Sequence, residues 1–144
     1  MVYTERNVWS GLVVSVVAVT IYVILMLQRM SAQPIAEVDW VWPMLWTIGL
    51  SIAATIVVSI LWGIFAGMRD PEGATVADVR DRDIERMGDR VGRAFMVIAG
   101  IGVLVLCAFG AEHFWIANAM FLGFALSAIV GGIAQVIAYR VGGA

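Results

Sequence analysis

The chain has 144 residues, of which 62% are hydrophobic, and its formal net charge is −2. Soluble domains are about 45–50% apolar, so this composition favours a membrane protein. The small net charge argues against direct nucleic-acid binding, and the single cysteine, Cys107, excludes an internal disulfide and a cysteine-based metal cluster.

Four long uncharged runs predict an all-α fold, a four-helix transmembrane bundle in which residues 1–144 form a single membrane domain. A span needs roughly 17–25 mostly apolar residues to cross about 30 Å of hydrocarbon. The first run exceeds the roughly 7–15 apolar residues of a typical signal peptide, so we interpret it as a retained span. We expect the spans over about 8–30, 43–68, 93–111 and 114–139.

The second span carries a small residue at every fourth position, and the fourth span repeats this pattern. Residues four apart share one helix face, and small side chains let helices approach closely in a bilayer. Packing within the bundle is the first interpretation, and the alternative is that one series serves a partner. The two series are Ser51, Thr55, Ser59, Gly63 and Gly67 in the second span, and Gly123, Ser127, Gly131 and Gln135 in the fourth.

Residues 69–92, between the second and third spans, predict a cytoplasmic turn followed by a charged amphipathic helix that extends the third span. Ten charges lie within residues 78–95, and each would cost about 2.5–3.5 kcal/mol at the centre of a bilayer. Opposite charges three or four positions apart should stabilise this helix by about 0.2–0.5 kcal/mol per pair. The expected pairs are Asp78–Arg82, Asp83–Arg86, Arg86–Asp89 and Asp89–Arg93.

This charged helix has two interpretations. It is either a solvated extension that orients the third span or a docking surface for a cytoplasmic protein or a second subunit. Anionic lipid is a poorer partner because the acidic residues cancel the arginines. The interaction candidates are Arg82, Asp83, Glu85, Arg86, Asp89 and Arg90.

The arginines predict how the chain is oriented. Eight arginines lie on the side of the termini and the charged connector, and only Arg29 lies on the other side. Cytoplasmic loops of membrane proteins are enriched in basic residues, so we expect both termini in the cytoplasm of a bacterium, with the spans in its inner membrane. Aromatic rings suited to headgroup depth then fall at the outer interface (Trp40, Trp42, Trp46 and Trp115) and at the inner one (Trp9 and Tyr139).

The sequence offers little chemistry. No charge lies in the central part of a span, where a proton-coupled transporter would carry a buried acid. His113, the only histidine, follows Glu112 in a tight turn, and one such ligand does not form a metal site. Asn118 and Gln135 are expected to hydrogen-bond between helices, and Cys107 to be a small packing residue. We therefore expect no catalytic site, cofactor or metal.

Two segments carry a resemblance to a known family: DVRDRDIERMGDRVGRAFMVIAG (78–100) and EHFWIANAMFLGFALSAIVGGIAQVIAYRVG (112–142). They resemble small bacterial and archaeal integral membrane proteins of unknown function, whose typical run begins DERD where this chain has DVRDRD. The likeness covers the C-terminal half, and the first two spans only in outline. It implies a four-span inner-membrane protein with a small transcriptional regulator as a candidate partner, and neither a reaction nor a substrate. The matching residues are Asp81, Arg82, Asp83, Ile84, Glu85, Gly88, Arg90 and Gly92, with Asn118 further on.

Together these features favour a non-enzymatic integral membrane protein that acts through protein–protein interaction, as a regulatory or accessory subunit of a membrane assembly. The expected partners are membrane lipids, further copies of the chain or a larger membrane complex, and a cytoplasmic regulator. The alternative is a small oligomeric transporter or channel, because the lack of an intramembrane acid does not argue against a passive pore.

Overall fold

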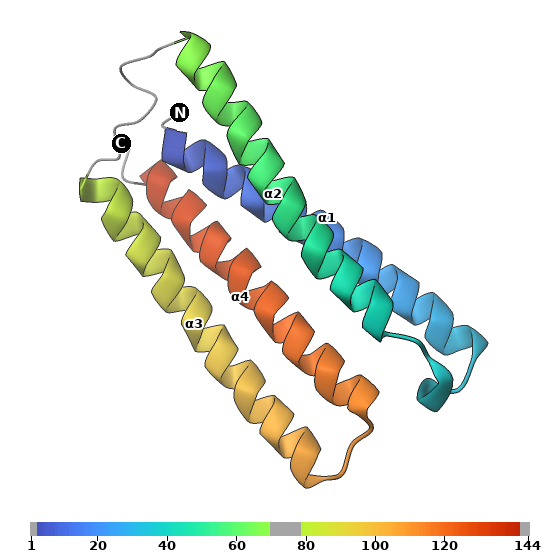
Figure 1. The fold of residues 1–144 in the computed structure, drawn as a ribbon. Coiled ribbons are helices and arrows are strands. Elements are labelled where there is room, and N and C mark those ends of the chain that lie inside the picture. Colours follow the sequence, from blue (N-terminus) through green and yellow to red (C-terminus); the bar gives the residue numbers. More distant parts are fainter. Residues whose placement is uncertain (1–2, 70–78, 142–144) are drawn as a thin grey trace.

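The computed structural model describes residues 3–69 and 79–141 (Figure 1). Neither range contains a strand. The all-α four-helix bundle expected from the sequence is confirmed. Its elements are the long helices α1 (Tyr3–Ala32), α2 (Val41–Arg69), α3 (Val79–Ala108) and α4 (His113–Val141), and the short 3-10 helix η1 (Ile35–Glu37).

Each long helix contains a stretch that is apolar and long enough to cross a membrane, so the chain is a multi-pass membrane protein. A helix suits this environment because it satisfies its backbone polar groups internally, where no water is available. α3 is one continuous helix, and its charged first half runs directly into its apolar second half. The candidate spans are Asn7–Ala32, Val41–Phe65, Arg80–Ala108 and His113–Val141; the narrower span limits expected from the sequence stay a prediction.

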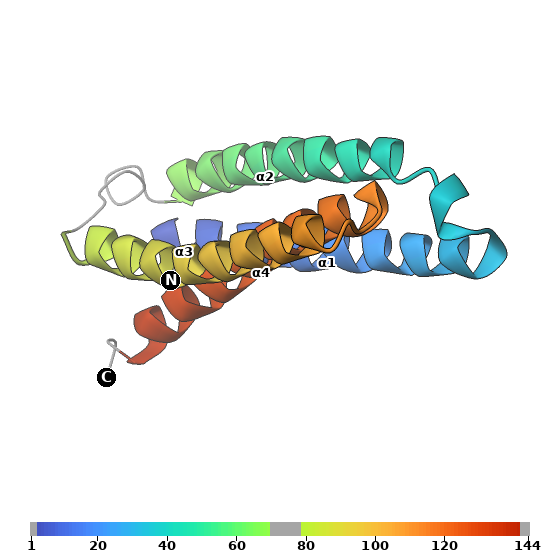
Figure 2. The same cartoon turned by 90° about the horizontal axis from the view of Figure 1, so that it is seen from below.

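The helices follow the spatial order α2, α1, α4, α3, because the main contacts join α1 to α2, α1 to α4 and α3 to α4. Figure 2 shows α2 in a layer of its own beside the other three helices. We call the end with the α1–α2 and α3–α4 connections the loop end, and the opposite end, where α1 and α3 begin, the terminal end. The bundle is therefore open, with α1 and α4 inside and α2 and α3 at its edges.

The main hydrophobic core lies at the loop end. Tyr22 of α1 is 1% exposed and packs with Met44 of α2 and with aromatic side chains of α4. Val38, from the α1–α2 connection, is buried in the same cluster. This cluster joins α1, α2 and α4 at the loop end, and its members are Tyr22, Met26, Val38, Met44, Phe114 and Phe121.

The α1–α2 connection is tied to the helices that it joins. The guanidinium group of Arg29 donates a hydrogen bond to the backbone carbonyl of Asp39. Pro34 precedes η1, and Pro43 lies in the first turn of α2, where a missing N–H costs no helical hydrogen bond. These contacts fix the connection that places Val38 in the core.

The α3–α4 connection is a tight glycine cap. Gly110 has a φ of 65°, a conformation that glycine adopts without steric cost. The amide of Ala111 donates to the carbonyl of Leu106 at 3.0 Å, and the amide of Gly110 donates to that of Cys107 at 3.0 Å. These two bonds form a Schellman motif, which ends α3 and lets α4 return antiparallel beside it.

Small residues let α3 and α4 pack closely. A Cβ added to Gly92 would lie 2.9 Å from the backbone oxygen of Ser127, and one added to Gly123 would overlap the Cβ of Ala99. The hydroxyl of Ser127 also donates a hydrogen bond to the carbonyl of Gly92 at 2.8 Å. In a bilayer such close packing replaces the hydrophobic effect between helices. The structure thus places the small-residue series of α4, Gly123, Ser127, Gly131 and Gln135, against α3.

Candidate interaction surfaces

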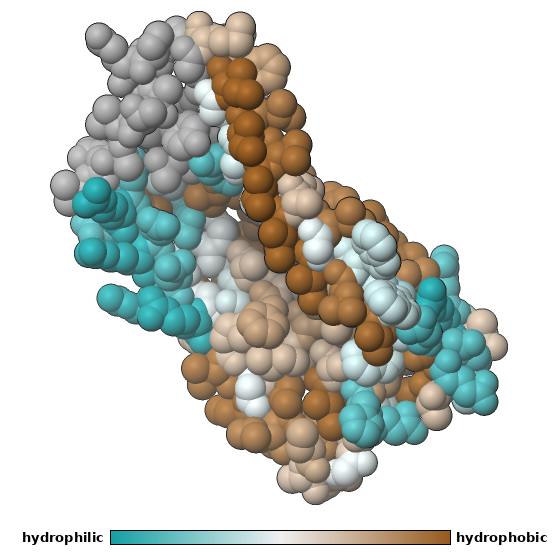
Figure 3. Space-filling view, in the orientation of Figure 1, coloured by the Kyte–Doolittle hydropathy of each residue, from teal (hydrophilic) through white to brown (hydrophobic). Residues whose placement is uncertain are grey.

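The charged part of α3 packs against α4 through one face only. Ile84 and Asp81 are 8% and 6% exposed, and Gly88 and Gly92 are also buried. Figure 3 shows the resulting hydrophilic patch at the terminal end of the molecule. The six interaction candidates from the sequence, Arg82, Asp83, Glu85, Arg86, Asp89 and Arg90, are all exposed.

Few of the expected ion pairs form along this helix. Arg86 lies 3.9 Å from Asp83, with both side chains at least 70% exposed. Among the described residues, the expected Arg86–Asp89 and Asp89–Arg93 ion pairs are wrong. Arg86 pairs with Asp83 instead, and Arg93 Nε donates to the backbone carbonyl of Asp89 at 3.3 Å. The predicted Asp78–Arg82 pair involves Asp78, which lies outside the described residues. Since exposed pairs contribute about 0–1 kcal/mol each, these charges add little to the stability of the helix.

Five of the exposed charges form two rows, and Arg80, Asp83 and Arg93 lie outside them. Residues four apart lie on nearly the same side of a helix, because one turn holds about 3.6 residues. We call Arg82, Arg86 and Arg90 the arginine row, and Glu85 and Asp89 the carboxylate row. The arginine row points away from the side that α4 covers, and the carboxylate row runs beside it. Within residues 3–69 and 79–141, Arg82, Glu85 and Arg90 form no ion pair.

The small-residue series of α2 has a different environment from that of α4. Ser51, Thr55, Ser59 and Gly63 are half-buried, whereas the surroundings of Gly67 lie outside the described side chains. The hydroxyl of Ser51 donates to the carbonyl of Thr47 at 2.6 Å, and that of Thr55 donates to the carbonyl of Ser51 at 2.8 Å. These polar groups are satisfied within α2 itself.

Two hollows flank this part of α2. Their volumes are about 470 and 420 Å³, and both are lined by Thr47 and Ser51 on α2 and by residues of α1. The larger hollow also reaches Phe121 and Phe124 of α4. α2 therefore packs less tightly on its neighbours than α3 does on α4.

A buried polar pair joins α1 to α4 near the loop end. The hydroxyl of Tyr22 donates a hydrogen bond to Oδ1 of Asn118 at 2.7 Å. The expectation that Asn118 hydrogen-bonds between helices is confirmed. The same expectation for Gln135 is wrong among the described residues, because its side chain packs against Gly88 of α3 instead. Sequence reasoning missed Tyr22, although a tyrosine in the middle of an apolar run needs a partner for its hydroxyl when it is buried.

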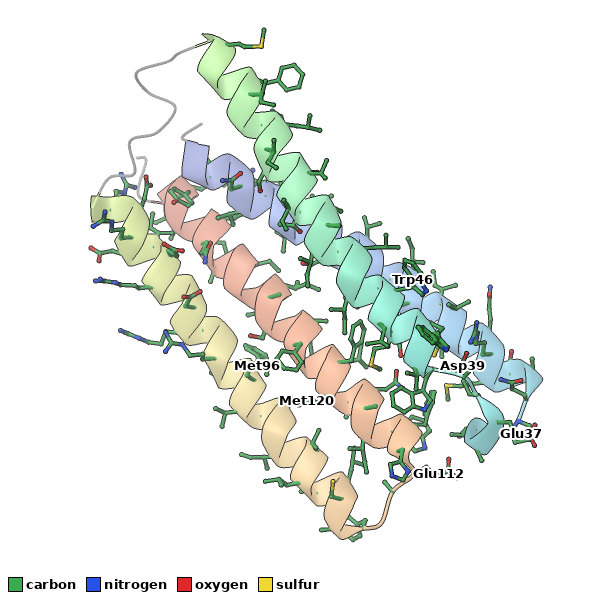
Figure 4. All side chains as sticks on the ribbon, in the orientation of Figure 1. Glu37, Asp39, Trp46, Met96, Glu112 and Met120 are labelled. Atoms are coloured by element: carbon green, nitrogen blue, oxygen red, sulfur yellow. The ribbon has the colours of Figure 1, made fainter. Side chains whose placement is uncertain are left out.

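Aromatic side chains gather at both ends of the bundle. Trp40, Trp42 and Trp46 lie in or beside the first turns of α2 at the loop end (Figure 4 labels Trp46). At the terminal end the guanidinium carbon of Arg140 lies 5.7 Å from the centre of the Trp9 ring. The buried Nε1 of Trp9 has no hydrogen-bond partner among the described residues. This distribution fits rings at two membrane interfaces.

The residues with reactive or ligating side chains do not converge. Glu112 and His113 are exposed at the loop end (Figure 4 labels Glu112). Among the described residues, 3–69 and 79–141, no three His, Cys, Asp or Glu side chains lie close enough to hold a metal ion. Cys107 is exposed on α3, so the expectation that it packs within the bundle is wrong. A small apolar side chain of this kind is equally well accommodated by lipid.

No family model, curated protein or solved structure matches the chain. The resemblance to small bacterial and archaeal membrane proteins stays a prediction. The geometry of the exposed surfaces is therefore the basis for proposing a function.

Proposed function

We propose that the chain is a non-enzymatic subunit of a membrane assembly and that the charged face of α3 docks a partner protein. The observation that carries the proposal is the arginine row, which is exposed on the side of α3 away from α4. Its members Arg82 and Arg90 form no ion pair with any described residue. Several charges that are desolvated together can select a partner and fix its register.

A docking role accounts for the charges better than a purely solvated extension does. A solvated helix gains stability from its charges mainly through pairs three or four positions apart, and here Arg86 and Asp83 form one such pair at 3.9 Å. The five arginines within residues 80–93 thus add little to the stability of the helix itself. A partner surface that presents carboxylates accounts for these exposed arginines.

The proposal includes an orientation. The terminal end, with the charged part of α3, faces the cytoplasm of a bacterium, and the helices span its inner membrane. Support comes from the eight arginines on that side of the chain against Arg29 on the other, because basic residues are retained in cytoplasmic loops.

Reversing the arginine row tests the proposal. The variant Arg82→Glu/Arg86→Glu/Arg90→Glu should insert into the membrane and lose the proteins that co-purify with the wild-type chain in mild detergent. The control is Arg82→Lys/Arg86→Lys/Arg90→Lys, which keeps the charge and should retain most of the partner. If the glutamate variant keeps every partner at wild-type yield, the charged face of α3 is only a solvated extension.

The second candidate function is a small oligomeric transporter or channel, and the hollow of about 470 Å³ between α1, α2 and α4 favours it. Most of its lining is apolar, and the hydroxyls of Thr47 and Ser51 bond to their own helix. Such a hollow suits an apolar solute rather than an ion. Flux of a hydrophobic dye across vesicles that contain the purified chain would favour this second function, and its absence would leave docking as the better one.

A further inference from the structure

We infer that the partner on the charged face of α3 is a second copy of this chain, with the arginine row of one copy paired to the carboxylate row of the next. The inference rests on the function proposed above and names the partner that it leaves open. It is carried by the arrangement of the two charged rows and by their depth in the bundle.

The two rows are complementary to each other. Arg82, Arg86 and Arg90 recur every fourth position, and Glu85 and Asp89 repeat with the same spacing along the adjacent side of the helix. The rows therefore have the same pitch and run side by side. A surface that binds the arginine row needs carboxylates at this spacing, and the chain presents such a surface itself.

Insertion in a membrane favours this pairing between two copies, because it makes their α3 helices parallel. Two copies inserted in the same orientation have parallel α3 helices and are related by rotation about an axis normal to the membrane. In a parallel pair, one flank of each helix meets the opposite flank of its neighbour, as the e and g positions do in a parallel coiled coil. The arginine row of one α3 then meets the carboxylate row of the other, with two carboxylates available for the three arginines.

The depth of the rows can be traced through the contacts. The turn of α4 that contains Gly131 packs against Gly88 of α3 on one side and against Leu12 of α1 on the other. The α1 turn that contains Leu12 lines a hollow together with Ala54 of α2. These four helical turns thus lie at about the same level of the bundle.

From this level α2 continues toward the terminal end as an apolar helix. It runs from Ala54 to Arg69, which at 1.5 Å per residue is about 22 Å. Ile56, Ile60 and Phe65 are each more than half exposed there. Figure 3 shows this hydrophobic surface of α2 reaching the same end of the molecule as the hydrophilic patch of α3.

Lipid cannot cover both surfaces. A bilayer that surrounds the apolar part of α2 brings the arginine and carboxylate rows to hydrocarbon depth, where charges require protein partners or water. If the bilayer instead became thinner around α3, so that the rows reached water, the cost would be a fraction of a kcal/mol for each Å of mismatch. Because α2 and α3 lie at opposite edges of the bundle, a second copy against α3 shields the charged rows and leaves α2 facing lipid. Anionic headgroups match the arginines alone and are repelled by the carboxylates.

Exchanging the rows tests whether the partner is a copy. The probes are two differently tagged full-length chains, reconstituted in zwitterionic phosphatidylcholine vesicles, and the readout is energy transfer between them. The arginine-reversed variant carries Arg82→Glu/Arg86→Glu/Arg90→Glu, the carboxylate-reversed variant carries Glu85→Arg/Asp89→Arg, and the row-exchanged variant carries all five changes.

We expect each single-row variant to self-associate about tenfold less than the wild type, since the facing rows then repel. The two single-row variants should associate with each other, and the row-exchanged variant should associate with itself as the wild type does. Both rescues also show that the variants fold. Loss of association in the row-exchanged variant, or wild-type association of the arginine-reversed one, overturns the inference.

The test separates this inference from the proposed function. A wild-type chain that is monomeric in vesicles, yet retains another protein from native membranes that the arginine-reversed variant loses, contradicts pairing between copies and supports docking of a different partner. An arginine-reversed variant that keeps every partner in native membranes contradicts both.

Discussion

The hydroxyl of Tyr22 on α1 donates a hydrogen bond to Oδ1 of Asn118 on the neighbouring α4, and the two oxygens lie 2.7 Å apart. The amide nitrogen of Asn118 in turn donates to the backbone carbonyl of Phe114 at 2.8 Å. The Tyr22 ring also packs on Phe121, with ring centres 4.5 Å apart. This pair therefore combines a polar and an aromatic contact at the point where α1 crosses α4.

Removing the Tyr22 hydroxyl should weaken this crossing. Tyr22→Phe keeps the ring contact with Phe121 and leaves Oδ1 of Asn118 without its partner. Hydrogen bonds between membrane helices contribute about 0.6 kcal/mol on average and about 1.7 at most, so we expect a loss within this range in an unfolding titration with a denaturing detergent. Thr20→Val is the control on the same helix, because the Thr20 hydroxyl is exposed and bonds to its own helix at Val16. Equal effects of the two changes would contradict a special role for Tyr22.

The close approach of α3 and α4 makes a second prediction. In Gly92→Ala the new methyl would lie 2.9 Å from the backbone oxygen of Ser127, which cannot move aside as a flexible side chain would. We expect a loss of about 1–3 kcal/mol in the free energy of unfolding, as for other overpacked sites. Gly102→Ala should be neutral or stabilising, since nothing lies within 4 Å of its added Cβ and alanine favours helices. Similar tolerance of both substitutions would show that the two helices are farther apart than described.

The attachment of α2 at the loop end makes a third prediction. Met44 is the residue through which α2 enters the buried cluster, so Met44→Ala should loosen α2 by about 2 kcal/mol. The adjacent Leu45 is 54% exposed, and Leu45→Ala should have a much smaller effect. Proteolysis of the reconstituted chain can compare the two variants, because a loosened α2 should be cleaved faster at its connection to α1. Equal cleavage rates would place the attachment of α2 elsewhere.

The proposed orientation predicts which positions react from outside the cell. In a Cys107→Ser background, Ala36→Cys in η1 should react with a membrane-impermeant maleimide added to intact cells. Arg80→Cys, at the start of α3 and before the arginine and carboxylate rows, should react only after the cells are opened. Both side chains are exposed in the structure, so access depends on the side of the membrane alone. The reverse pattern would invert the topology.

The number and kind of elements could be predicted from the sequence because they depend on local composition. Long uncharged runs can be stable in a bilayer only as helices, and the tight turn at Glu112 and His113 makes the last two helices antiparallel neighbours. The exposure of Arg82 and Arg90 could also be expected, since isolated arginines are costly to bury.

The arrangement of the helices could not be predicted, because it depends on the fit between particular side chains. The small-residue series of α2 and α4 look alike in the sequence, yet only the series of α4 meets a matching surface on α3, with Ala99 facing Gly123. Similarly, Asn118 has many possible partners at its depth, and its bond to Tyr22 follows from how α1 crosses α4. Lipid and protein are about equally apolar, so hydropathy alone does not distinguish the helix faces that pack from those that face lipid.

The central position of α4 has a consequence for how the chain is made. Membrane helices are synthesised in chain order, and α4 is the fourth of the four, yet it supplies the main contacts of α3 and half of those that hold α1 in place. While α4 is still inside the ribosome, α3 lacks the helix that makes its main contacts. Until α4 is inserted, α1 and α2 have each other to pack against, and the closing of the bundle around α4 is therefore a late step in its assembly.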